Sequence, residues 1–188
     1  MLKGVRVIAG KFGSRTLEAP AGMLTRPTSD RLRETLFNVL APRIEGALFL
    51  DLYAGSGAVG IEAVSRGAAS AEFVECAQPA LKALRANLAR FGMSAGVHSA
   101  RVASWLKRSI QEKKNKKFDL IFLDPPYDLD AEYETTLGLL EALLAPQGMV
   151  IAEHRRKDKL ETNYGALERT RLLEQGDAAL SFFILKQS

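Results

Sequence analysis

Two short segments of the chain hold residues whose types and spacing could do chemistry. The first is DLYAGSGAVG, in which Gly55, Gly57 and Gly60 form a GxGxxG pattern after an apolar run. Such a turn can bind the phosphates of a dinucleotide, and an acidic residue about 20 positions later accepts from the ribose hydroxyls. Glu75 stands at that spacing from Gly55. This spacing suits any cofactor that contains adenosine, so it does not separate nicotinamide or flavin enzymes from other nucleotide-binding enzymes.

Asp51, at the mouth of the same turn, favours a different cofactor. A carboxylate there would repel a pyrophosphate at the helix N-terminus, but it would attract the ammonium group, or lie near the sulfonium, of S-adenosylmethionine. The alternative is that Asp51 only accepts hydrogen bonds within the turn and that the glycines only allow a tight connection. Because of this charge, we favour S-adenosylmethionine as the ligand of the turn, then a dinucleotide, and last a turn with only a structural role.

The second segment is FDLIFLDPPYD, where an apolar run ends in Asp124, Pro125, Pro126 and Tyr127. The two prolines remove two backbone donors, so the local polar groups are acceptors. The exocyclic amino group of a base is a poor nucleophile, and acceptors for its N–H groups can aim its lone pair at a methyl group. Tyr127 can stack on the base. The alternative is a stiff turn in which Asp124 caps a helix.

These segments need a scaffold that brings them together. From residue 47 onward, short apolar strands alternate with helical segments, which is typical of βαβ units and a parallel sheet. We expect strands over residues 47–52, 71–75, 96–102, 118–124 and 149–153, followed by an antiparallel hairpin over 168–175 and 179–186. The predicted fold class is α/β: a mostly parallel, doubly wound, Rossmann-like sheet with an antiparallel C-terminal edge. Its strand ends would bring Asp51, Glu75 and Asp124 to one edge.

The residues before the first core strand predict two further elements. Residues 1–20 alternate apolar and polar positions around Gly10 and Gly13, which predicts a β-hairpin appendage. Thr28 or Ser29 can cap a helix that Pro42 is expected to end. The whole chain, 1–188, is expected to be one domain in which residues 21–188 form the core.

Composition and charge exclude several classes of protein. The chain has 188 residues, of which 47% are hydrophobic, enough for one good core. No apolar run approaches the ~20 residues of a membrane span and no secretory signal is visible, so we expect a cytoplasmic protein. One cysteine and two histidines predict no metal site. Basic residues cluster at 3–15, 26–33, 113–117 and 154–159, which together favour nucleic acid, although any one cluster is typical of a solvated surface.

Four segments together closely resemble the bacterial 16S ribosomal RNA guanine-N2 methyltransferase family, RsmD: VRVIAGKFGSRTLEAP, TRPTSDRLRETLFNVL, DLYAGSGAVGIEAVSRGA and DPPY. DPPY is shared among amino-methyltransferases, whereas RPTSDRLRE is more specific to this family. The resemblance implies a class I methyltransferase fold. It also implies transfer of a methyl group from S-adenosylmethionine to N2 of one guanine, leaving S-adenosylhomocysteine. The implied partner is 16S rRNA in a small ribosomal subunit or an assembly intermediate, and we expect a monomer.

The resemblance also implies residue roles by position. The methionine part of the cofactor would be held by Asp51, Gly55 and Gly57, with Tyr53, Ala54 and Ser56 completing the turn, and the ribose by Glu75. The target base would be held by Asp124, Pro125, Pro126 and Tyr127. Four residues would face the RNA or frame the cleft: Arg26, Thr28, Arg31 and Arg33. On a helix Arg31 and Arg33 cannot share one face, so at least one is expected to serve solvent or Glu34. Where the family commonly has Asp or Asn near the adenine, this chain has Arg101 and Val102.

Three alternatives remain open from the sequence. An adenine-N6 methyltransferase acting on DNA or RNA would share DPPY, although the chain is short for a separate target-recognition domain. An NAD-dependent oxidoreductase would share the glycine turn, and an RNA-binding module without catalysis would share the basic clusters. With an unperturbed pKa of about 4, Asp124 is expected to orient the amino group rather than deprotonate it before attack.

Overall fold

A continuous sheet runs through the molecule. The computed structural model describes residues 5–20, 29–112, 116–126 and 130–186, and over these residues the sheet has eight strands in the order β3-β2-β1-β4-β5-β8-β7-β6. The parallel part contains β1 (Leu48–Leu52), β2 (Ser70–Glu75), β3 (Gly96–Ser99), β4 (Phe118–Leu123) and β5 (Leu144–Arg155). The antiparallel edge contains β6 (Asn163–Tyr164), β7 (Leu167–Gln175) and β8 (Ala178–Leu185). The predicted α/β fold with an antiparallel C-terminal edge is confirmed.

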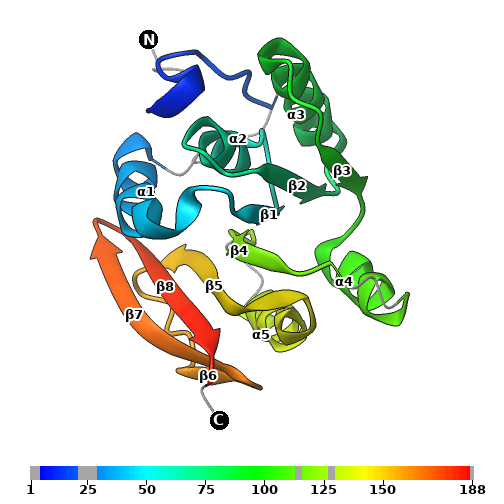
Figure 1. Cartoon of the computed structure of the whole chain (residues 1–188). Helices are drawn as coiled ribbons and strands as arrows, with labels where there is room; N and C mark the ends of the chain where they lie inside the picture. Colours follow the sequence, from blue (N-terminus) through cyan, green and yellow to red (C-terminus); the bar gives the residue numbers. More distant parts are fainter. Residues whose placement is uncertain (1–4, 21–28, 113–115, 127–129, 187–188) are drawn as a thin grey trace.

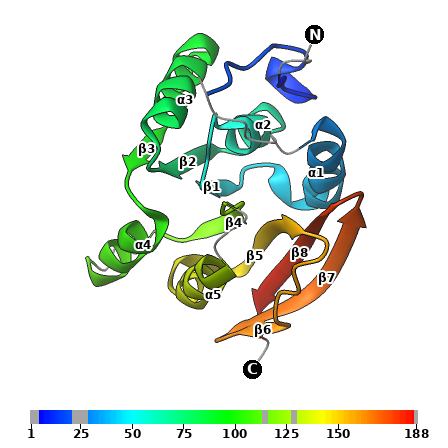
Figure 2. The same cartoon turned by 180° about the vertical axis from the view of Figure 1, so that it is seen from behind.

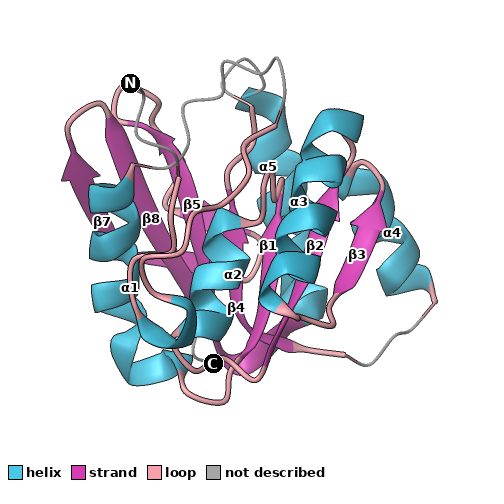
Figure 3. Ribbon diagram, turned by 90° about the horizontal axis from the view of Figure 1, so that it is seen from above, coloured by secondary structure: helices cyan, strands magenta, loops and turns pink. Residues whose placement is uncertain are grey.

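Helices cover both faces of the sheet, as Figures 1 and 2 show from opposite sides. One face carries α1 (Asp30–Ile44), α2 (Ala58–Ser65) and α3 (Gln78–Phe91), which lie in front of the strands in Figure 3. The other carries α4 (Val102–Gln111), α5 (Asp130–Leu139) and the short 3₁₀ helix η2 (Leu140–Leu143). This double winding buries both faces of β1 and β4, whose runs of apolar residues are typical of central parallel strands.

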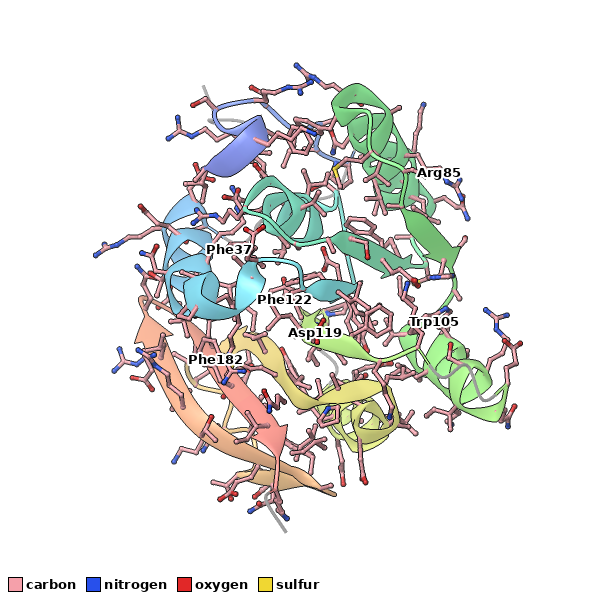
Figure 4. All side chains as sticks on the ribbon, in the orientation of Figure 1. Phe37, Arg85, Trp105, Asp119, Phe122 and Phe182 are labelled. Carbon is pink, nitrogen blue, oxygen red and sulfur yellow. The ribbon has the colours of Figure 1, made fainter. Side chains whose placement is uncertain are left out.

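Two apolar clusters fill the space between the helices and the sheet. On the first face Phe37, Phe122 and Phe182 are buried between α1 and the strands β4 and β8 (Figure 4). On the second face Trp105 of α4 is buried against the sheet and lies against the ring of His98, with 5.0 Å between ring centroids. Over the described ranges, no helix combines the length and the apolar character that a membrane crossing needs.

The N-terminal segment folds back on itself as a short antiparallel hairpin, as predicted, but it is packed more closely to the rest of the protein than an appendage. Arg6 and Thr16 form its antiparallel bridge, and the turn is the 3₁₀ helix η1 (Gly10–Phe12). The segment packs into the core through buried Val7, Phe12 and Leu17. Backbone hydrogen bonds join its two sides: the Val7 amide donates to Arg15 at 2.9 Å and the Leu17 amide donates to Val5 at 2.8 Å. Other amides bond to α2: Ile8 and Ala9 donate to the carboxylate of Glu62, and Phe12 donates to the Ser65 hydroxyl. Side chains of α2 therefore satisfy the amides that the short hairpin ladder leaves unpaired.

Two other boundaries differ from the expectation. Ser29 caps α1 by accepting a hydrogen bond from the Leu32 amide at 3.1 Å, as predicted, but α1 runs through Pro42 to Ile44. Proline near the end of a helix removes one hydrogen bond, and the remaining turn is held by packing. Residues 96–102 were expected to form one strand, whereas β3 ends at Ser99 and α4 begins at Val102. Thr28, the other candidate cap, lies outside the described residues.

Candidate active site

The carboxyl ends of β1, β2, β4 and β5 meet at one edge of the sheet. Asp51 lies in β1 and pairs in register with Phe73 of β2 and Phe122 of β4. Glu75 ends β2, and Asp124 follows β4 directly. The structure therefore brings the three predicted acidic residues to the same edge, where ligands bind in open parallel sheets.

The glycine turn is shaped around Asp51. The carboxylate is buried and its Oδ2 accepts a hydrogen bond from the Gly60 amide at 2.8 Å. A Cβ at Gly60 would lie 2.4 Å from a ring carbon of Phe73 and 3.1 Å from Asp51 Oδ2, so only glycine allows this approach. Gly55 differs, because no atom lies within 4 Å of the position that its Cβ would take. Gly55 thus borders open space in which a ligand can lie.

Glu75 ties the turn to the end of β2. Its Oε2 accepts from the Gly55 amide at 2.8 Å, and its Oε1 accepts from the amides of Cys76 at 2.7 Å and Ala77 at 2.8 Å. A carboxylate has about four acceptor positions, so Oε2 keeps capacity for a ribose hydroxyl. These three hydrogen bonds join the glycine turn after β1 to the backbone that follows β2.

The rest of the turn is held by backbone and side-chain amides. The Ala54 amide donates to Val74 at 3.1 Å, and the Gly57 amide donates to Ala54 at 2.8 Å. The Ser56 carbonyl accepts from the Asn87 side chain at 3.0 Å. Asn87, which is fully buried on α3, was not predicted as a site residue. An asparagine on the apolar face of a helix was the sequence signal for it, because a buried amide needs partners.

Tyr53 connects the turn to α5. It has a φ of 59°, a left-handed conformation that residues other than glycine rarely adopt. Its hydroxyl lies 2.8 Å from Oε2 of Glu132, to which it donates, and 2.8 Å from the hydroxyl of Thr136. Burial raises the pKa of Tyr53, so the hydroxyl keeps its proton. Because α5 follows the DPPY segment, Tyr53 joins the predicted cofactor turn to the predicted base-binding segment.

The acidic residues at the edge do not have ordinary pKa values. Burial raises the pKa of Asp51 from 3.8 to about 8, against the hydrogen bond from Gly60, and the charge of Glu75 adds to the rise. Burial also raises the pKa of Asp124 well above its ordinary value, with further rises from the charges of Glu153 and Asp51. The expectation of an unperturbed Asp124 is wrong, because the sequence does not reveal how deeply the carboxyl lies or that Glu153 is beside it.

The prolines of the acceptor segment have different surroundings. Pro125 is buried and Pro126 is exposed, and Tyr127 lies outside the described residues. Within the part of the chain that the structure describes, no group of three or more His, Cys, Asp or Glu side chains is arranged to hold a metal ion.

Comparison with known proteins decides the family. A family model described as conserved hypothetical protein 95 matches residues 5–184. The chain is 39% identical over 160 residues to a protein of Escherichia coli K12 named ribosomal RNA small subunit methyltransferase D, covering 84% of this chain and 78% of that protein. The chain belongs to the RsmD family. Its resemblance to this family, inferred from the four segments, is confirmed.

Two further relatives cover nearly the full RsmD-family chain. YlbH of Bacillus subtilis, named a putative rRNA methyltransferase, is 36% identical over 169 residues, which is 89% of this chain and 91% of that protein. The solved structure of a hypothetical protein of Thermus thermophilus superposes with a TM-score of 0.80 at 32% identity, covering 97% of this chain and 99% of that one. The shared fold therefore extends from the N-terminal segment to the C-terminal hairpin.

Arg33 of this RsmD-family chain was predicted to face RNA or to frame the cleft, and its burial contradicts a contact with RNA. Its side chain is fully buried, donates to the Arg6 carbonyl and to Asp30 at 2.9 Å, and lies 3.9 Å from the carboxylate of Glu62. Glu62 is itself fully buried and bonds to Arg66 Nε at 2.6 Å. A buried carboxylate needs nearby cations, and Arg33 is on the face of α1 that meets it.

The other predicted RNA residues have different outcomes. Arg31 is exposed on the first turn of α1, so it points away from the face that holds Arg33, as the helical spacing required. Arg26 and Thr28 lie outside the described residues. Arg31 is thus the described arginine of this segment that is free to meet RNA at the surface.

Several basic residues in the sequence clusters have partners within the protein. Arg15 lies over the ring of Phe91, 4.3 Å from its centroid, and donates to the Arg90 carbonyl. Arg155 pairs with Asp158 at 2.7 Å, and Arg156 pairs with Glu174 at 3.0 Å. In contrast, Arg85 points outward from α3 (Figure 4). The clusters at 3–15 and 154–159 are therefore less available to phosphates than their composition suggests.

Proposed function

We propose that this protein transfers a methyl group from S-adenosylmethionine to the exocyclic N2 of a guanine in 16S ribosomal RNA. The observation that carries the proposal is the position of Asp124, Pro125 and Pro126 at the same sheet edge as Asp51 and Glu75. Membership of the RsmD family supports the methyl donor and the RNA substrate, because the Escherichia coli relative is named a ribosomal RNA small subunit methyltransferase.

The turn fits the proposed cofactor in charge and in space. Gly55 borders open space, Glu75 keeps acceptor capacity for a ribose hydroxyl, and the Asp51 carboxyl lies buried against Gly60 near the charge of Glu75. A buried carboxylate is a strong partner for a cation and a poor partner for a pyrophosphate. S-adenosylmethionine supplies a methyl group on a positive sulfur. These features support the methyl donor over the dinucleotide that the glycine pattern alone would also allow.

Asp124 and the DPPY backbone would act on the amino group of the base. The carboxylate and a carbonyl of the segment accept the two N–H groups and aim the nitrogen lone pair at the methyl carbon. The N–C bond forms as the C–S bond breaks, and the nitrogen becomes cationic. With its raised pKa, Asp124 is a stronger base than an ordinary carboxylate, so it can take the proton that the nitrogen then loses.

A pair of Asp124 variants tests this function. Purified wild-type protein is incubated with labelled S-adenosylmethionine and small ribosomal subunits that lack the modification, and transfer of label to RNA is measured. Asp124→Asn and Asp124→Ala should abolish transfer, while calorimetry shows largely intact cofactor binding. Glu141→Gln, which changes an exposed acid on η2, serves as the matched control and should retain full transfer. Unchanged turnover in the Asp124 variants would remove this mechanism.

We also infer that residues 1–188 act as one domain and as a monomer in the cytoplasm, where the RNA is found. The N-terminal segment supports one domain because Val7, Phe12 and Leu17 share a cluster with α1, α2 and α3. Among the described residues, Leu172 is the exposed large hydrophobic side chain, so those residues offer little apolar surface to a second copy.

A further inference from the structure

Glu153 is a buried acid that no sequence motif marks. It lies in β5, within the apolar run MVIAE, and only 2% of it is exposed. Glutamate is almost never buried to this degree without a specific reason. Its position at the carboxyl end of β5 places it at the same sheet edge as the proposed active site.

The strand register brings Glu153 beside Asp124. Leu123 of β4 pairs with Ala152 of β5, and both belong to the cluster under α4 and α5. Asp124 directly follows Leu123 at the end of β4, and Glu153 follows Ala152 within β5. Successive side chains of a strand alternate between faces, so Glu153 is directed to the face that carries α1, α2 and α3. The charge of Glu153 acts on Asp124 from this neighbouring strand. Asp51 reaches that face too, because it contacts Gly60 of α2.

Two negative charges act on Asp124. They come from Glu153 of β5 and from Asp51 of β1, and Glu75 of β2 acts in turn on Asp51. On the helices packed against this face, buried Arg33 of α1 interacts with Asp30 and Glu62. A neighbouring carboxylate makes a buried carboxyl group hold its proton more tightly, so the charge of Glu153 strengthens Asp124 as a base.

We propose that Glu153 is a positioning residue for methyl transfer: its carboxylate, next to Asp124 in the strand register, forms a carboxyl pair with it and sets the strength of Asp124 as a base. This proposal rests on the proposed function. When the target nitrogen gains the methyl group, it becomes cationic and releases one proton to the ionised oxygen of Asp124. The electron pair of that N–H bond returns to nitrogen, and Asp124 later releases the proton to water. Glu153 makes Asp124 a good acceptor without touching the base.

The pH dependence of kcat tests the role of Glu153. Asp124 must be ionised to accept the proton, so kcat falls on the acid side as Asp124 becomes protonated. Glu153→Gln removes the adjacent negative charge and lowers the pKa of Asp124, so the acid limb should move to lower pH by about one unit. Glu153→Asp keeps the charge, so the acid limb of its kcat profile should stay at nearly the same pH as in the wild type. Glu141→Gln, an exposed acid on η2, should leave the limb unmoved.

The possible failures can be told apart. A structural role for Glu153 would lower stability and yield but leave the acid limb in place, and that result would overturn the proposal. Absence of transfer by the wild type at every pH would instead overturn the proposed function. A second measurement needs no Glu153 variant. Carboxyl carbon NMR of the wild type should show coupled titration of Asp124 and Glu153, assigned with Asp124→Asn, whereas independent titrations at ordinary pH would contradict the pair.

Discussion

Cofactor binding should depend steeply on pH, because Asp51 must lose a proton before it can pair with a cation. Its pKa is raised from 3.8 to about 8, so the free protein holds the neutral carboxyl at pH 7. S-adenosylmethionine carries ammonium and sulfonium charges that favour the ionised form. If only that form binds, apparent affinity falls about tenfold for each pH unit below 8. At pH 6 about 1% of Asp51 is ionised, so binding should be about 100-fold weaker than above pH 9.

Isothermal titration calorimetry at pH 6, 7, 8 and 9 measures this dependence. Repeating each titration in two buffers with different ionisation enthalpies gives the number of protons released, which should be about one per cofactor below pH 8. Asp51→Asn keeps the size of the side chain and cannot ionise, so it should bind weakly and with little pH dependence. An affinity that is flat across this range in the wild type, or an equal slope in Asp51→Asn, would refute the reasoning.

Three further substitutions, one of them with a surface control, test the packing around the site. Arg33→Met removes the buried cation near Glu62 and should lower the free energy of unfolding by about 3 kcal/mol, whereas Arg31→Gln at the surface should change it by less than about 0.5 kcal/mol; urea unfolding measures both. Tyr53→Phe removes the hydroxyl contacts with α5, which should lower unfolding free energy by about 1 kcal/mol and reduce kcat more than cofactor affinity. Gly60→Ala forces a Cβ against the ring of Phe73 and should destabilise the protein by about 1–3 kcal/mol and weaken cofactor binding, as calorimetry would show.

The fold was largely predictable from short apolar strands and the glycines between helices. The apolar run of β4 indicated a central strand because helices on both faces require it. The N-terminal segment was predictable as a hairpin but not in its packing, since some of its amides are satisfied by Glu62 and Ser65, more than 50 positions away. Local alternation of residue types cannot reveal such partners. Helix α4 was not predicted, although its buried residues Val102, Trp105 and Leu106 recur at helical spacing, because its first residue was assigned to the preceding strand.

The acidic residues of the candidate site were predictable because they lie at the ends of strands. Asp51, Glu75 and Asp124 each follow or end an apolar run, and the topology of parallel sheets places such ends together. Arg33 was assigned to RNA because its segment is basic, but its direction on α1 is decided by the buried charge of Glu62. Glu153 stands in an apolar strand without a motif. Its importance follows only from strand register and burial, which a single sequence does not contain.

The most direct test of the central claim is the identity of the methylated nucleoside. Small ribosomal subunits lacking the modification are incubated with the protein and labelled S-adenosylmethionine. The RNA is digested to nucleosides for mass spectrometry, and a parallel sample is mapped to locate the site. We expect label in N2-methylguanosine at one position of 16S rRNA, and none with Asp124→Ala. Label in N6-methyladenosine, or no transfer to RNA while the protein binds S-adenosylmethionine, would contradict it.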